Sequence, residues 1–526
     1  MAATNVAELL QRLAARDGSR VAMVDGERRV TWSELDGVVD DLSRGLATSG
    51  LVGGQRVAIA LQNSLEFVVT YLACLRGGMV AVPLSPATGT GEVARMLAES
   101  GARWCFADAS TIATVRGAVS GISDALVGDG DDLPMSAVIP KVAVVGGPVL
   151  PGETSYKGLL HQTGPRVSTP LDSEALAALI YTAGTSGHHR PAMLTHRALI
   201  ANIDQAARVT PSMVTRGDVV LGVLPLSHAF GLNMVLGQVL LHGATLVLAR
   251  QFDARGTLQL IEAERVTCLP LAAPIIAAWA SLPEAAQHLT SVRTVLSGAA
   301  PLPIHQMHAF ESATGLPVEQ CYGLTEAAPL VTSTVGTGRH KPGSVGAALP
   351  GVELRVVDPS GRDSAVGDPG EIWMRGGNVF SGYWPDGDGA PGVDGWLRTG
   401  DVGFLDIEED LHVIDRLREL VVVSGFNVYP SEVEEVVREV EGVAECAVIG
   451  VPDVTTGEAA VVFVVAADGR DADLSEAVGL HCERRLARFK VPAAVHVVNE
   501  LLHSATGEVA KHRLRELEAR RAMGLS

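Results

Sequence analysis

Two kinds of hydrophobic pattern alternate along the first half of the chain. Residues 31–49 have a polar entry followed by the apolar spacing of a helix, and residues 64–75 repeat that spacing. Residues 56–61 and 79–84 are short apolar runs with the length of strands. Apolar strands that alternate with helices predict a mostly parallel sheet with helices on its faces, which is an α/β fold.

The pattern changes further along the chain. Residues 121–170 are rich in Gly, Pro and Asp, and we expect surface loops around short strands there. Residues 342–383 contain short apolar stretches between Gly-rich turns, which predict a β-rich subdomain, and a polar loop follows at 385–395.

The end of the chain has the pattern of a separate small domain. Ser431 and Glu434 have the spacing of a capping box before a helix at 433–440. Two apolar runs at 444–451 and 459–465 predict strands, and we expect a helix at 480–489.

These patterns predict two domains. A large N-terminal domain, 1–415, contains helix-flanked sheets and the β-rich subdomain, and a small mobile α+β domain, 416–526, follows it. We place the hinge at 415–420, near Arg418, where a strand ends and charged residues cluster.

Composition narrows the class of protein. A chain of 526 residues is too long for one core, which agrees with two or more domains. The net charge of −19 disfavours binding to a phosphate backbone, so we expect no nucleic-acid partner. The six cysteines lack paired spacing, and no signal-peptide pattern or apolar run of about 18 residues is present. We therefore expect reduced thiols, no membrane span and a cytoplasmic location.

The strongest local motif is Tyr-Thr-Ala-Gly-Thr-Ser-Gly at 181–187, directly after the apolar strand 176–180. Glycines allow a sharp turn that brings backbone N–H groups near an anion, and the hydroxyls of Thr and Ser add donors. The motif predicts a phosphate-binding loop, and an ordinary strand-to-loop turn is the alternative.

Further motifs follow in a fixed order. They are LTH at 194–196, LPLSHAFG at 224–231, SGAAPL at 297–302, QCYGLTE at 320–326, WLRTGD at 396–401, DRLRE at 415–419 and GFNVYPSEVE at 425–434. Together with the loop at 181–187, this set resembles the adenylate-forming acyl-CoA ligase superfamily, which also includes firefly-type luciferases and peptide-synthetase adenylation domains. The resemblance extends from about residue 31 to about residue 514.

The resemblance implies roles for individual residues. Tyr322 matches the aromatic side chain that stacks on adenine, Asp401 and Arg416 match the pair that holds the ribose hydroxyls, and Thr325 matches a contact to the α-phosphate. Glu326 matches the carboxylate that holds magnesium. All residues assigned to the adenylate are Thr182, Ala183, Gly184, Thr185, Ser186, Gly187, Gly298, Ala299, Ala300, Pro301, Gln320, Cys321, Tyr322, Gly323, Leu324, Thr325, Asp401 and Arg416.

The resemblance also implies sites for the acyl group and for CoA. His228 matches the residue at the mouth of the acyl pocket, and Ser424, Gly425 and Phe426 match the loop that opens a tunnel for the pantetheine of CoA. Candidate acyl-pocket residues, chosen as small or apolar groups without charged partners, are Phe230, Leu232, Asn233, Cys268, Leu269 and Ala272. They suggest a bulky apolar acid, and chain fatty acids, aryl acids and terpenoid acids all remain open.

Each assignment has a structural alternative. Tyr322 is also compatible with core packing, Asp401 with Arg416 can form an ordinary salt bridge, and His228 can be a core histidine. We interpret Glu432 and Glu434 as a solvated helix start rather than a catalytic pair.

Two departures from the family pattern concern the adenylation step. The usual T-S-G-T-T-G-x-P-K-G loop has Ala183 in place of a Ser and Arg190 in place of the Lys. The usual C-terminal L-P-x-x-x-x-G-K-I has Glu508 where the family Lys bridges the acyl carboxylate and the α-phosphate. Lys511 lies three residues later and, on an extended segment, would point elsewhere.

Because the residues implied in thioester formation are present, the sequence predicts a ligase that joins an acyl-adenylate to CoA and releases AMP, with adenylation lost or strongly impaired. This resembles the non-adenylating acyl-CoA ligases of platensimycin-type diterpenoid natural product biosynthesis, which implies a separate adenylating ligase as the source of acyl-AMP. Two alternatives remain. One is a complete ATP-dependent acyl-CoA synthetase, in which Lys511 substitutes or Glu508 has been introduced in place of a natural Lys. The other is a non-catalytic acyl-adenylate- or AMP-binding protein. Magnesium is compatible with either enzyme, and the sequence leaves the oligomeric state open.

Overall fold

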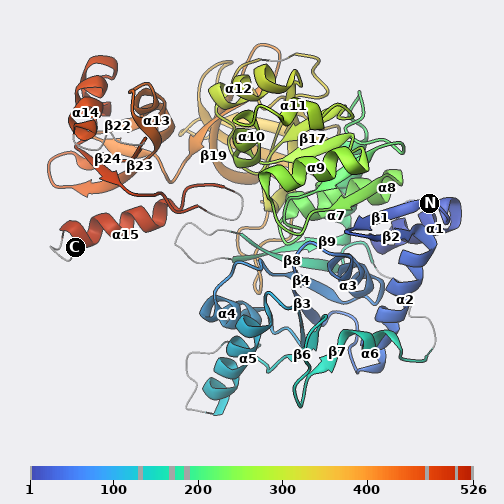
Figure 1. The fold of residues 1–526 in the computed structure, drawn as a ribbon. Coiled ribbons are helices and arrows are strands. Elements are labelled where there is room, and N and C mark those ends of the chain that lie inside the picture. The colour runs from blue at the N-terminus through green and yellow to red at the C-terminus, as the bar shows by residue number, and fades with distance from the viewer. Residues whose placement is uncertain are drawn as a thin grey trace. The chain divides into compact units, whose positions relative to one another are not determined.

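The chain folds into two compact units (Figure 1). In this computed structural model the described residues are 3–127, 134, 136–164, 172–182, 190–339, 341–467, 473–503 and 507–522. Among them, the first unit contains the residues up to Glu353 together with Met374–Leu397, and the second contains Leu354–Trp373 and the residues from Arg398 onward. The predicted boundary at 415/416 falls inside the second unit, and it stays a prediction about which part of the chain moves.

One sheet of the first unit has seven strands in the order β7-β6-β5-β3-β4-β8-β9. Neighbours from β7 to β8 are parallel, and only β8 and β9 are antiparallel. The strands are β3 (Arg56–Ala60), β4 (Val80–Pro83), β5 (Trp104–Ala107), β6 (Lys141–Val144), β7 (Thr154–Ser155), β8 (Leu176–Thr182) and β9 (Arg190–Thr195).

Helix caps explain why the first helices begin where the sequence predicted. The Thr31 hydroxyl accepts a hydrogen bond from the Glu34 N–H, and the Glu34 carboxylate accepts one from the Thr31 N–H at 2.8 Å, which completes a capping box. The Ser64 hydroxyl caps the next helix in the same way by accepting from the Phe67 N–H. The helices near this sheet are α2 (Trp32–Thr48), α3 (Leu65–Arg76), α4 (Thr90–Ser100), α5 (Ile112–Val127) and α6 (Tyr156–Leu160).

The second sheet of this unit has nine strands in the order β16-β15-β14-β13-β12-β10-β11-β1-β2. The six strands from β14 to β1 run parallel, and β2, β15 and β16 are antiparallel to their neighbours. Their bounds are β1 (Val21–Asp25), β2 (Arg28–Thr31), β10 (Val219–Gly222), β11 (Thr245–Leu248), β12 (Cys268–Leu271), β13 (Thr294–Ser297), β14 (Val318–Gly323), β15 (Leu330–Ser333) and β16 (Ala347–Ala348).

Helices and short helical turns connect these strands. They are α1 (Ala7–Asp17), α7 (His196–Ala207), the π-helix η1 (Phe230–Gly237), α8 (Gln238–His242), α9 (Ala254–Glu264), α10 (Ala273–Ala280), α11 (Ala285–His288), α12 (Ile304–Thr314) and the 3-10 turn η2 (Thr325–Ala327). None of the helices in the described ranges is long and apolar enough to cross a membrane.

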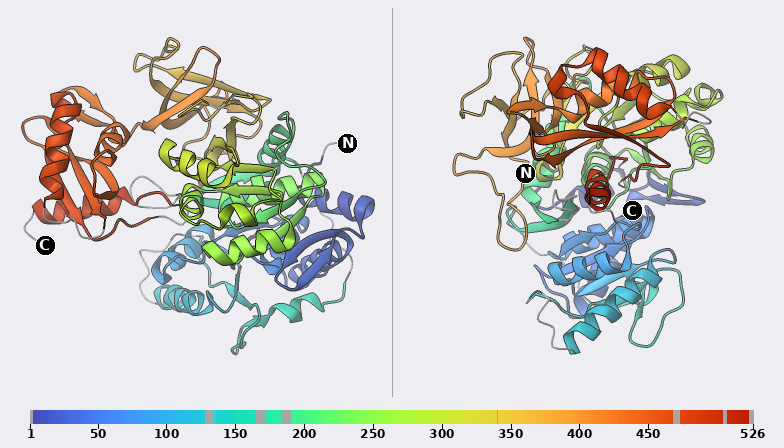
Figure 2. Two further views of the ribbon diagram at one scale, coloured as in Figure 1. Left: turned by 45° about the horizontal axis from the view of Figure 1, so that its top comes forward. Right: turned by 90° about the vertical axis from the view of Figure 1, so that its left-hand side faces the viewer.

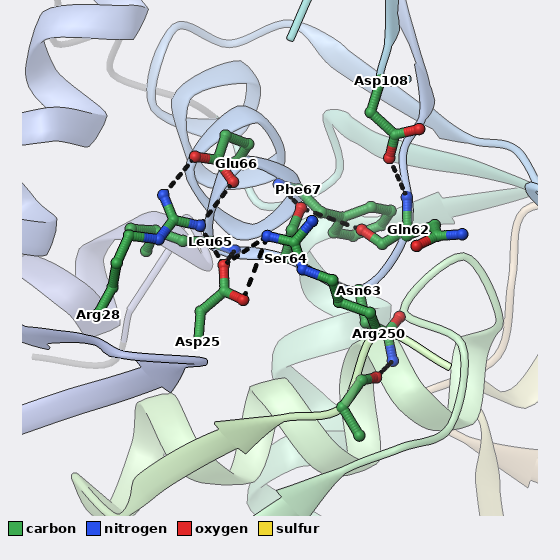
Figure 3. A network of polar contacts seen from close by, with 11 residues as sticks. Asp25, Arg28, Gln62, Asn63, Ser64, Leu65, Glu66, Phe67, Asp108 and Arg250 are labelled. Atoms are coloured by element: carbon green, nitrogen blue, oxygen red, sulfur yellow. Dashed lines mark hydrogen bonds and ion pairs between the residues drawn. The ribbon is translucent and has the colours of Figure 1, made fainter. Parts of the chain in front are cut away.

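Hydrogen bonds from the segment before α3 connect the two sheets of the first unit. Figure 3 shows Asn63 of this segment together with Asp25 and Arg28. The buried amide of Asn63 donates to the Leu224 carbonyl at 2.9 Å and accepts from the Leu226 N–H at 2.9 Å. Beside it, the Asp25 carboxylate accepts from the Leu65 N–H and pairs with Arg28. Asn63 therefore holds the loop that follows β10, which carries His228.

The second unit contains a small sheet in the order β22-β21-β24-β23, with β25 parallel to β24. Its elements are coloured from orange to red in Figure 2. Alternate residues of β24 face two separate cores: Val462 and Val464 pack with α13 and α14, whereas Val461 and Phe463 pack with Leu514 of α15. The elements are β21 (Val421–Val423), β22 (Phe426–Val428), α13 (Pro430–Arg438), β23 (Val443–Asp453), β24 (Gly457–Ala466), α14 (Leu474–Arg485), η3 (Arg488–Lys490), β25 (Ala494–Val498) and α15 (Lys511–Ala522).

A four-stranded sheet, ordered β17-β18-β19-β20, belongs mostly to the second unit. Its first two strands lie in the region 342–383 that was predicted to be β-rich, and its last two strands lie beyond that region. Its last two strands are antiparallel. The bounds are β17 (Val352–Val357), β18 (Gly370–Gly376), β19 (Leu397–Leu405) and β20 (Leu411–Arg416).

Several predicted elements need correction. The region 121–170 is not only loops and short strands, because α5 extends to Val127 and α6 follows β7. The helix expected at 480–489 is α14, which ends at Arg485. The capping box at Ser431 and Glu434 is wrong: Pro430 begins α13, the Ser431 hydroxyl donates to the Ile414 carbonyl, and the Glu434 carboxylate accepts from the Val448 N–H. The Glu434 carboxylate is therefore bound by other residues of the second unit and is not simply solvated.

Candidate functional site

The loop after β13 packs directly on the first residue of η1. A Cβ atom on Gly298 would lie 2.4 Å from Cε2 of Phe230, so only glycine fits against this buried ring. The next residue, Ala299, has a φ of +67°, which turns the loop sharply towards Ala300 and Pro301. The segment predicted to line adenine and the first predicted acyl-pocket residue are thus in contact.

The loop after β14 starts at the same sheet edge. Ser297 and Gln320 are register partners on parallel strands, so Gly298 and Tyr322 leave the sheet on neighbouring strands. The Gln320 amide donates to the Ser344 carbonyl at 3.2 Å, and Cys321 is buried. The hydrogen bond from Gln320 holds β14 in place at this edge of the sheet.

A tight reversal follows Tyr322. A Cβ on Gly323 would lie 2.0 Å from the Pro329 carbonyl oxygen, and the Leu324 N–H donates to that oxygen at 2.9 Å. The reversal presents Thr325 and Glu326 on the turn η2. In QCYGLTE the backbone therefore requires Gly323, and the oxygen-bearing side chains of Thr325 and Glu326 follow after Leu324.

Tyr383 lies beside this turn and was missed by the sequence analysis. Its hydroxyl donates a short hydrogen bond to the Glu326 carboxylate, and burial raises the pKa of the Tyr383 hydroxyl. The Arg190 guanidinium lies 4.1 Å from the centre of the Tyr383 ring and pairs with Asp388 at 2.6 Å. The signal available in the sequence was a group of three aromatic residues, Phe380, Tyr383 and Trp384, in a Gly-rich segment, which alone indicates no partner.

His228 is held in its neutral form. Burial lowers the pKa of His228 to about 4, and its Nδ1 accepts a hydrogen bond from the Phe230 N–H at 3.3 Å. With Nδ1 engaged as an acceptor, the proton of the neutral ring resides on Nε2. His228 is therefore a neutral donor on the loop that Asn63 anchors.

The predicted acyl-pocket residues do not all lie together. Ala272 follows Leu271, whose carbonyl accepts from the Gly298 N–H at 3.1 Å, so Ala272, Phe230 and Gly298 lie at one sheet edge. Cys268 and Leu269 are buried at the start of β12, which places them about 10–13 Å along the chain from Ala272.

The other two members of this set lie inside η1. Leu232 is buried, and the buried Asn233 amide donates to the Ala328 carbonyl at 2.6 Å and to the Leu199 carbonyl at 3.1 Å. Asn233 thus fixes the turn that carries Glu326.

A second group of predicted residues lies together in the second unit. Asp401 and Arg416 are register partners on β19 and β20, with the Arg416 Nε 3.7 Å from Oδ1 of Asp401. The Arg416 Nη2 donates to Oε1 of Glu508 at 3.0 Å. Arg416 therefore lies between two carboxylates, one of which stands at the position of the family Lys.

Lys511 begins α15 and does not lie on the extended segment that the sequence analysis assumed. Its ammonium pairs with Glu434 at 2.9 Å and with Glu419 at 3.0 Å, and its side chain is 15% exposed. Nearby carboxylates outweigh burial and raise the pKa of Lys511. This lysine is charged, and its ammonium is held between two carboxylates.

The predicted CoA loop is a tight turn between β21 and β22. Ser424 and Gly425 have φ angles of +51° and +85°, as a two-residue hairpin turn requires. The exposed Phe426 ring stacks on Phe489 with centroids 4.6 Å apart. Arg418 lies in the turn after β20, between Leu417 and Glu419.

Part of the predicted phosphate loop lies outside the described residues. The Thr182 hydroxyl donates to the Arg190 carbonyl at 3.3 Å across β8 and β9. Ala183, Gly184, Thr185, Ser186 and Gly187 are not among the described residues.

Comparisons with known proteins identify the family and the fold of this chain. The family described as AMP-binding enzyme matches residues 10–384, and its C-terminal domain matches residues 432–508. A long-chain-fatty-acid–CoA ligase of Yersinia pestis is 32% identical over 98% of this chain and 95% of its own length. An indoleacetate–CoA ligase of Aromatoleum aromaticum is 32% identical over 98% of both chains. The ATP-bound structure of MatB from Rhodopseudomonas palustris has a TM-score of 0.86 at 29% identity and covers 98% of this chain and 99% of its own.

The chain therefore belongs to the family of AMP-binding enzymes. Within that family it is an acyl-CoA ligase of the adenylate-forming type, with the α/β architecture predicted from its sequence.

Proposed function

We propose that this ligase forms an acyl-CoA thioester from an acyl-adenylate and CoA, and that its ATP-dependent adenylation step is lost or strongly impaired. In the retained step the CoA sulfur attacks the acyl carbonyl carbon, the bond to the AMP phosphate oxygen breaks, and the thiol proton is released. The single observation that carries the proposal is the pairing of Glu508 with Arg416.

The expected energies favour a slow adenylation step and a retained thioester-forming step. Loss of one preorganised donor to developing charge costs roughly 3–4 kcal/mol of transition-state stabilisation. A carboxylate in place of an ammonium adds repulsion of about 4 kcal/mol for unit charges about 4 Å apart at an effective dielectric near 20. Adenylation is therefore slow while Glu508 occupies the position of the Lys, whereas thioester formation needs no cation from that position.

The surroundings of Lys511 support the same proposal. The complete-synthetase alternative needs a substitute cation, but Lys511 is bound to Glu419 and Glu434. Its release would leave two little-exposed carboxylates without their shared cation, which is costly. Arg190, at the position of the phosphate-loop Lys, is paired with Asp388, but this pair is exposed and is easier to break than the pairs of Lys511.

The remaining proposed roles follow the resemblance. Tyr322 stacks on adenine, Asp401 and Arg416 hold the ribose, and neutral His228 donates a hydrogen bond at the mouth of the acyl pocket. Gly425 leaves room for pantetheine.

Magnesium fits this site only together with a phosphate. The described residues contain no group of three or more metal-ligating side chains, but Glu326 and Thr325 offer hard oxygen ligands, and Mg²⁺ commonly binds one carboxylate plus substrate phosphates. When bound, the ion would stabilise negative charge on phosphate oxygens.

The acyl substrate is proposed as a bulky apolar acid. Phe230, Leu232 and Ala272 offer apolar surface near the sheet edge, and the relatives named above include ligases of long-chain fatty acids and of indoleacetate. A separate adenylating ligase would supply the acyl-adenylate, as the resemblance to the platensimycin-type enzymes implies.

A second candidate is a complete ATP-dependent acyl-CoA synthetase. Its support is the 32% identity over 98% of the chain to a long-chain-fatty-acid–CoA ligase and the similarity to an ATP-bound structure. A third, non-catalytic AMP binding, would leave both half-reactions inactive.

The decisive experiment compares two substrate mixtures. The unmodified chain is incubated with CoA and preformed acyl-AMP, or with CoA, acid, ATP and magnesium, for aliphatic, aryl and terpenoid acyl groups. We expect acyl-CoA from the first mixture, and little acyl-CoA or pyrophosphate from the second. Robust pyrophosphate release would establish the complete synthetase, and inactivity in both mixtures would favour the non-catalytic alternative.

A substitution tests the role of Glu508 in the same assays. Glu508→Lys should raise pyrophosphate release by restoring the donor and removing the repulsion, worth up to a few kcal/mol. The gain will be partial, because the new cation faces Arg416 and because Arg190 and Ala183 also alter the phosphate loop. Unchanged pyrophosphate release would mean that residue 508 does not limit adenylation.

A further inference from the structure

Arg416 is held from both sides, and only one side is fixed by regular backbone pairing. Asp401 lies opposite Arg416 in the β19–β20 ladder, so the strands themselves place that carboxylate. Glu508 comes from a distant part of the chain and makes the shorter contact, 3.0 Å against 3.7 Å for Asp401. The second carboxylate is therefore the closer partner of the guanidinium.

The segment that carries Glu508 is itself anchored. The Ala510 N–H donates to the Leu502 carbonyl at 2.7 Å, and Val509 forms a β-bridge with His503. Leu501 and Leu514 are buried in the core beneath α15. These contacts fix the backbone on the C-terminal side of Glu508, and Lys511 adds two ion pairs. Glu508 thus contacts Arg416 from a backbone segment that is itself held in place.

We propose that Glu508 is a positioning residue for the ribose clamp. It holds the Arg416 guanidinium beside Asp401, so that the ribose hydroxyls of an adenylate meet a preformed donor and acceptor. Fixing a long arginine side chain costs conformational entropy, and a carboxylate that fixes it before the ligand arrives removes that cost from binding. The proposal rests on the proposed ribose role of Asp401 and Arg416, and it gives Glu508 a part in the retained half-reaction.

The test measures binding of AMP alone, by calorimetry, to the full-length protein. Glu508→Ala should weaken AMP binding by about three- to tenfold, a range set by the partial exposure of the pair. Glu508→Gln should weaken it less, because the amide oxygen still accepts a hydrogen bond. The matched control is Glu516→Gln, which removes an exposed carboxylate that pairs with Arg513 on α15, and it should leave AMP binding unchanged.

A double-mutant cycle establishes whether Glu508 acts through Arg416. In an Arg416→Ala background, Glu508→Ala should have little further effect on the Kd for AMP, because its partner is gone. With acyl-AMP and CoA as substrates, Glu508→Ala should raise KM and change kcat little. Rescue by Glu508→Gln in both measurements would agree with positioning.

Unchanged or tighter AMP binding by a folded Glu508→Ala protein would overturn the proposal. Tighter binding would mean that Glu508 repels the nucleotide phosphate instead. An equal effect of Glu508→Ala with and without Arg416 would also overturn it. AMP binding requires no turnover, so this result is separate from whether the unmodified protein converts acyl-AMP to acyl-CoA.

Discussion

At the scale of single residues, the C-terminal region contains two charged side chains that the sequence places three positions apart and the structure gives different partners. Glu508 pairs with Arg416, whereas Lys511 lies between Glu419 and Glu434. One pair lies at the proposed adenylate site, and the other holds α15 to α13. Glu508 and Lys511 therefore have two separate structural roles.

Removal of the Lys511 charge should destabilise the protein. Lys511→Met leaves two carboxylates of low exposure without their cation, and we expect the free energy of unfolding to fall by about 3–5 kcal/mol at pH 7. Burial would raise the pKa of the Glu419 carboxyl, but Lys511 outweighs burial and lowers that pKa, so the loss should shrink as pH falls through the acidic range. Urea unfolding monitored by circular dichroism measures both effects.

Arg513→Met is the matched control on the same helix. Its pair with Glu516 is exposed, so this change should cost less than about 1 kcal/mol. Equal losses from the two substitutions would contradict the structural role of Lys511.

His196 should make stability depend on pH. It is fully buried, its Nδ1 accepts from the Val6 N–H at 3.4 Å, and burial lowers its pKa from 6.5 to about 4. Between those values the unfolded chain binds a proton that the folded chain does not, so stability is lost as pH falls, by up to about 3 kcal/mol. His196→Gln should flatten the dependence of the unfolding free energy on pH between 6.5 and 4.

The flattening will be partial, because burial also lowers the pKa of His228 to about 4. His308→Gln, which changes an exposed histidine, serves as the control and should leave the slope as it is. A slope that His196→Gln does not alter would show that this side chain does not bind the proton on unfolding.

At the scale of elements, the β21–β22 turn offers a test of the proposed CoA path. A Cβ at Gly425 meets nothing within 4 Å, so a side chain there disturbs only the backbone, whose φ is +85°, or an incoming ligand. Gly425→Leu should abolish thioester formation from acyl-AMP and CoA while AMP still binds. Gly361→Leu introduces the same side chain at a φ of +84°, also in open space, and should keep turnover.

If both leucine variants turn over alike, the role assigned to this turn is wrong. A non-glycine residue with left-handed φ costs roughly 1–2 kcal/mol at either position. Thermal unfolding of both leucine variants will therefore show whether a loss of turnover comes from a loss of stability.

The elements that the sequence predicted well carry their own local signals. Thr31 with Glu34 and Ser64 mark two helix starts, and the apolar strands between them are parallel and buried as expected. Ser431 and Glu434 have the same local spacing, but Pro430 begins that helix and both side chains have partners from distant segments. Local spacing cannot distinguish a cap from a tertiary contact.

The candidate site shows the same limit. Motifs identify Tyr322, Glu326, Asp401 and Arg416 because each stands in a recognisable run. Tyr383 reaches Glu326 across 57 residues, and Arg416 reaches Glu508 across 92, so neither contact has a sequence signal. Such pairings depend on how the strands meet in space.

At the scale of the whole molecule, the hinge near Arg418 stays a prediction, and it concerns how the residues on either side of Arg418 are attached. The residue before it is bound to β19 through the Leu417 N–H and the Gly400 carbonyl at 2.8 Å. The residue after it, Glu419, is bound to Lys511. Arg418 thus lies between one residue attached to the β-rich sheet and one attached to the last helix.

Arg418→Pro should impair turnover more than binding. Proline fixes φ and removes a backbone donor, so a pivot at this residue would lose its freedom. We expect acyl-CoA formation from acyl-AMP to fall by roughly tenfold or more with little change in the Kd for AMP. Arg418→Ala removes the same side chain without restricting the backbone, and normal turnover in both variants would place the pivot elsewhere.

The six buried cysteines have a consequence for handling an activated acyl group. Burial raises the pKa of every one of these thiols, to about 12 for Cys105, Cys268, Cys321 and Cys446 and about 11 for Cys482. A protonated, enclosed sulfur is a poor nucleophile, so these six thiols do not compete with CoA for an activated acyl group. In the native protein, the thiol that a colorimetric disulfide reagent consumes is then that of CoA, and its disappearance reports turnover directly.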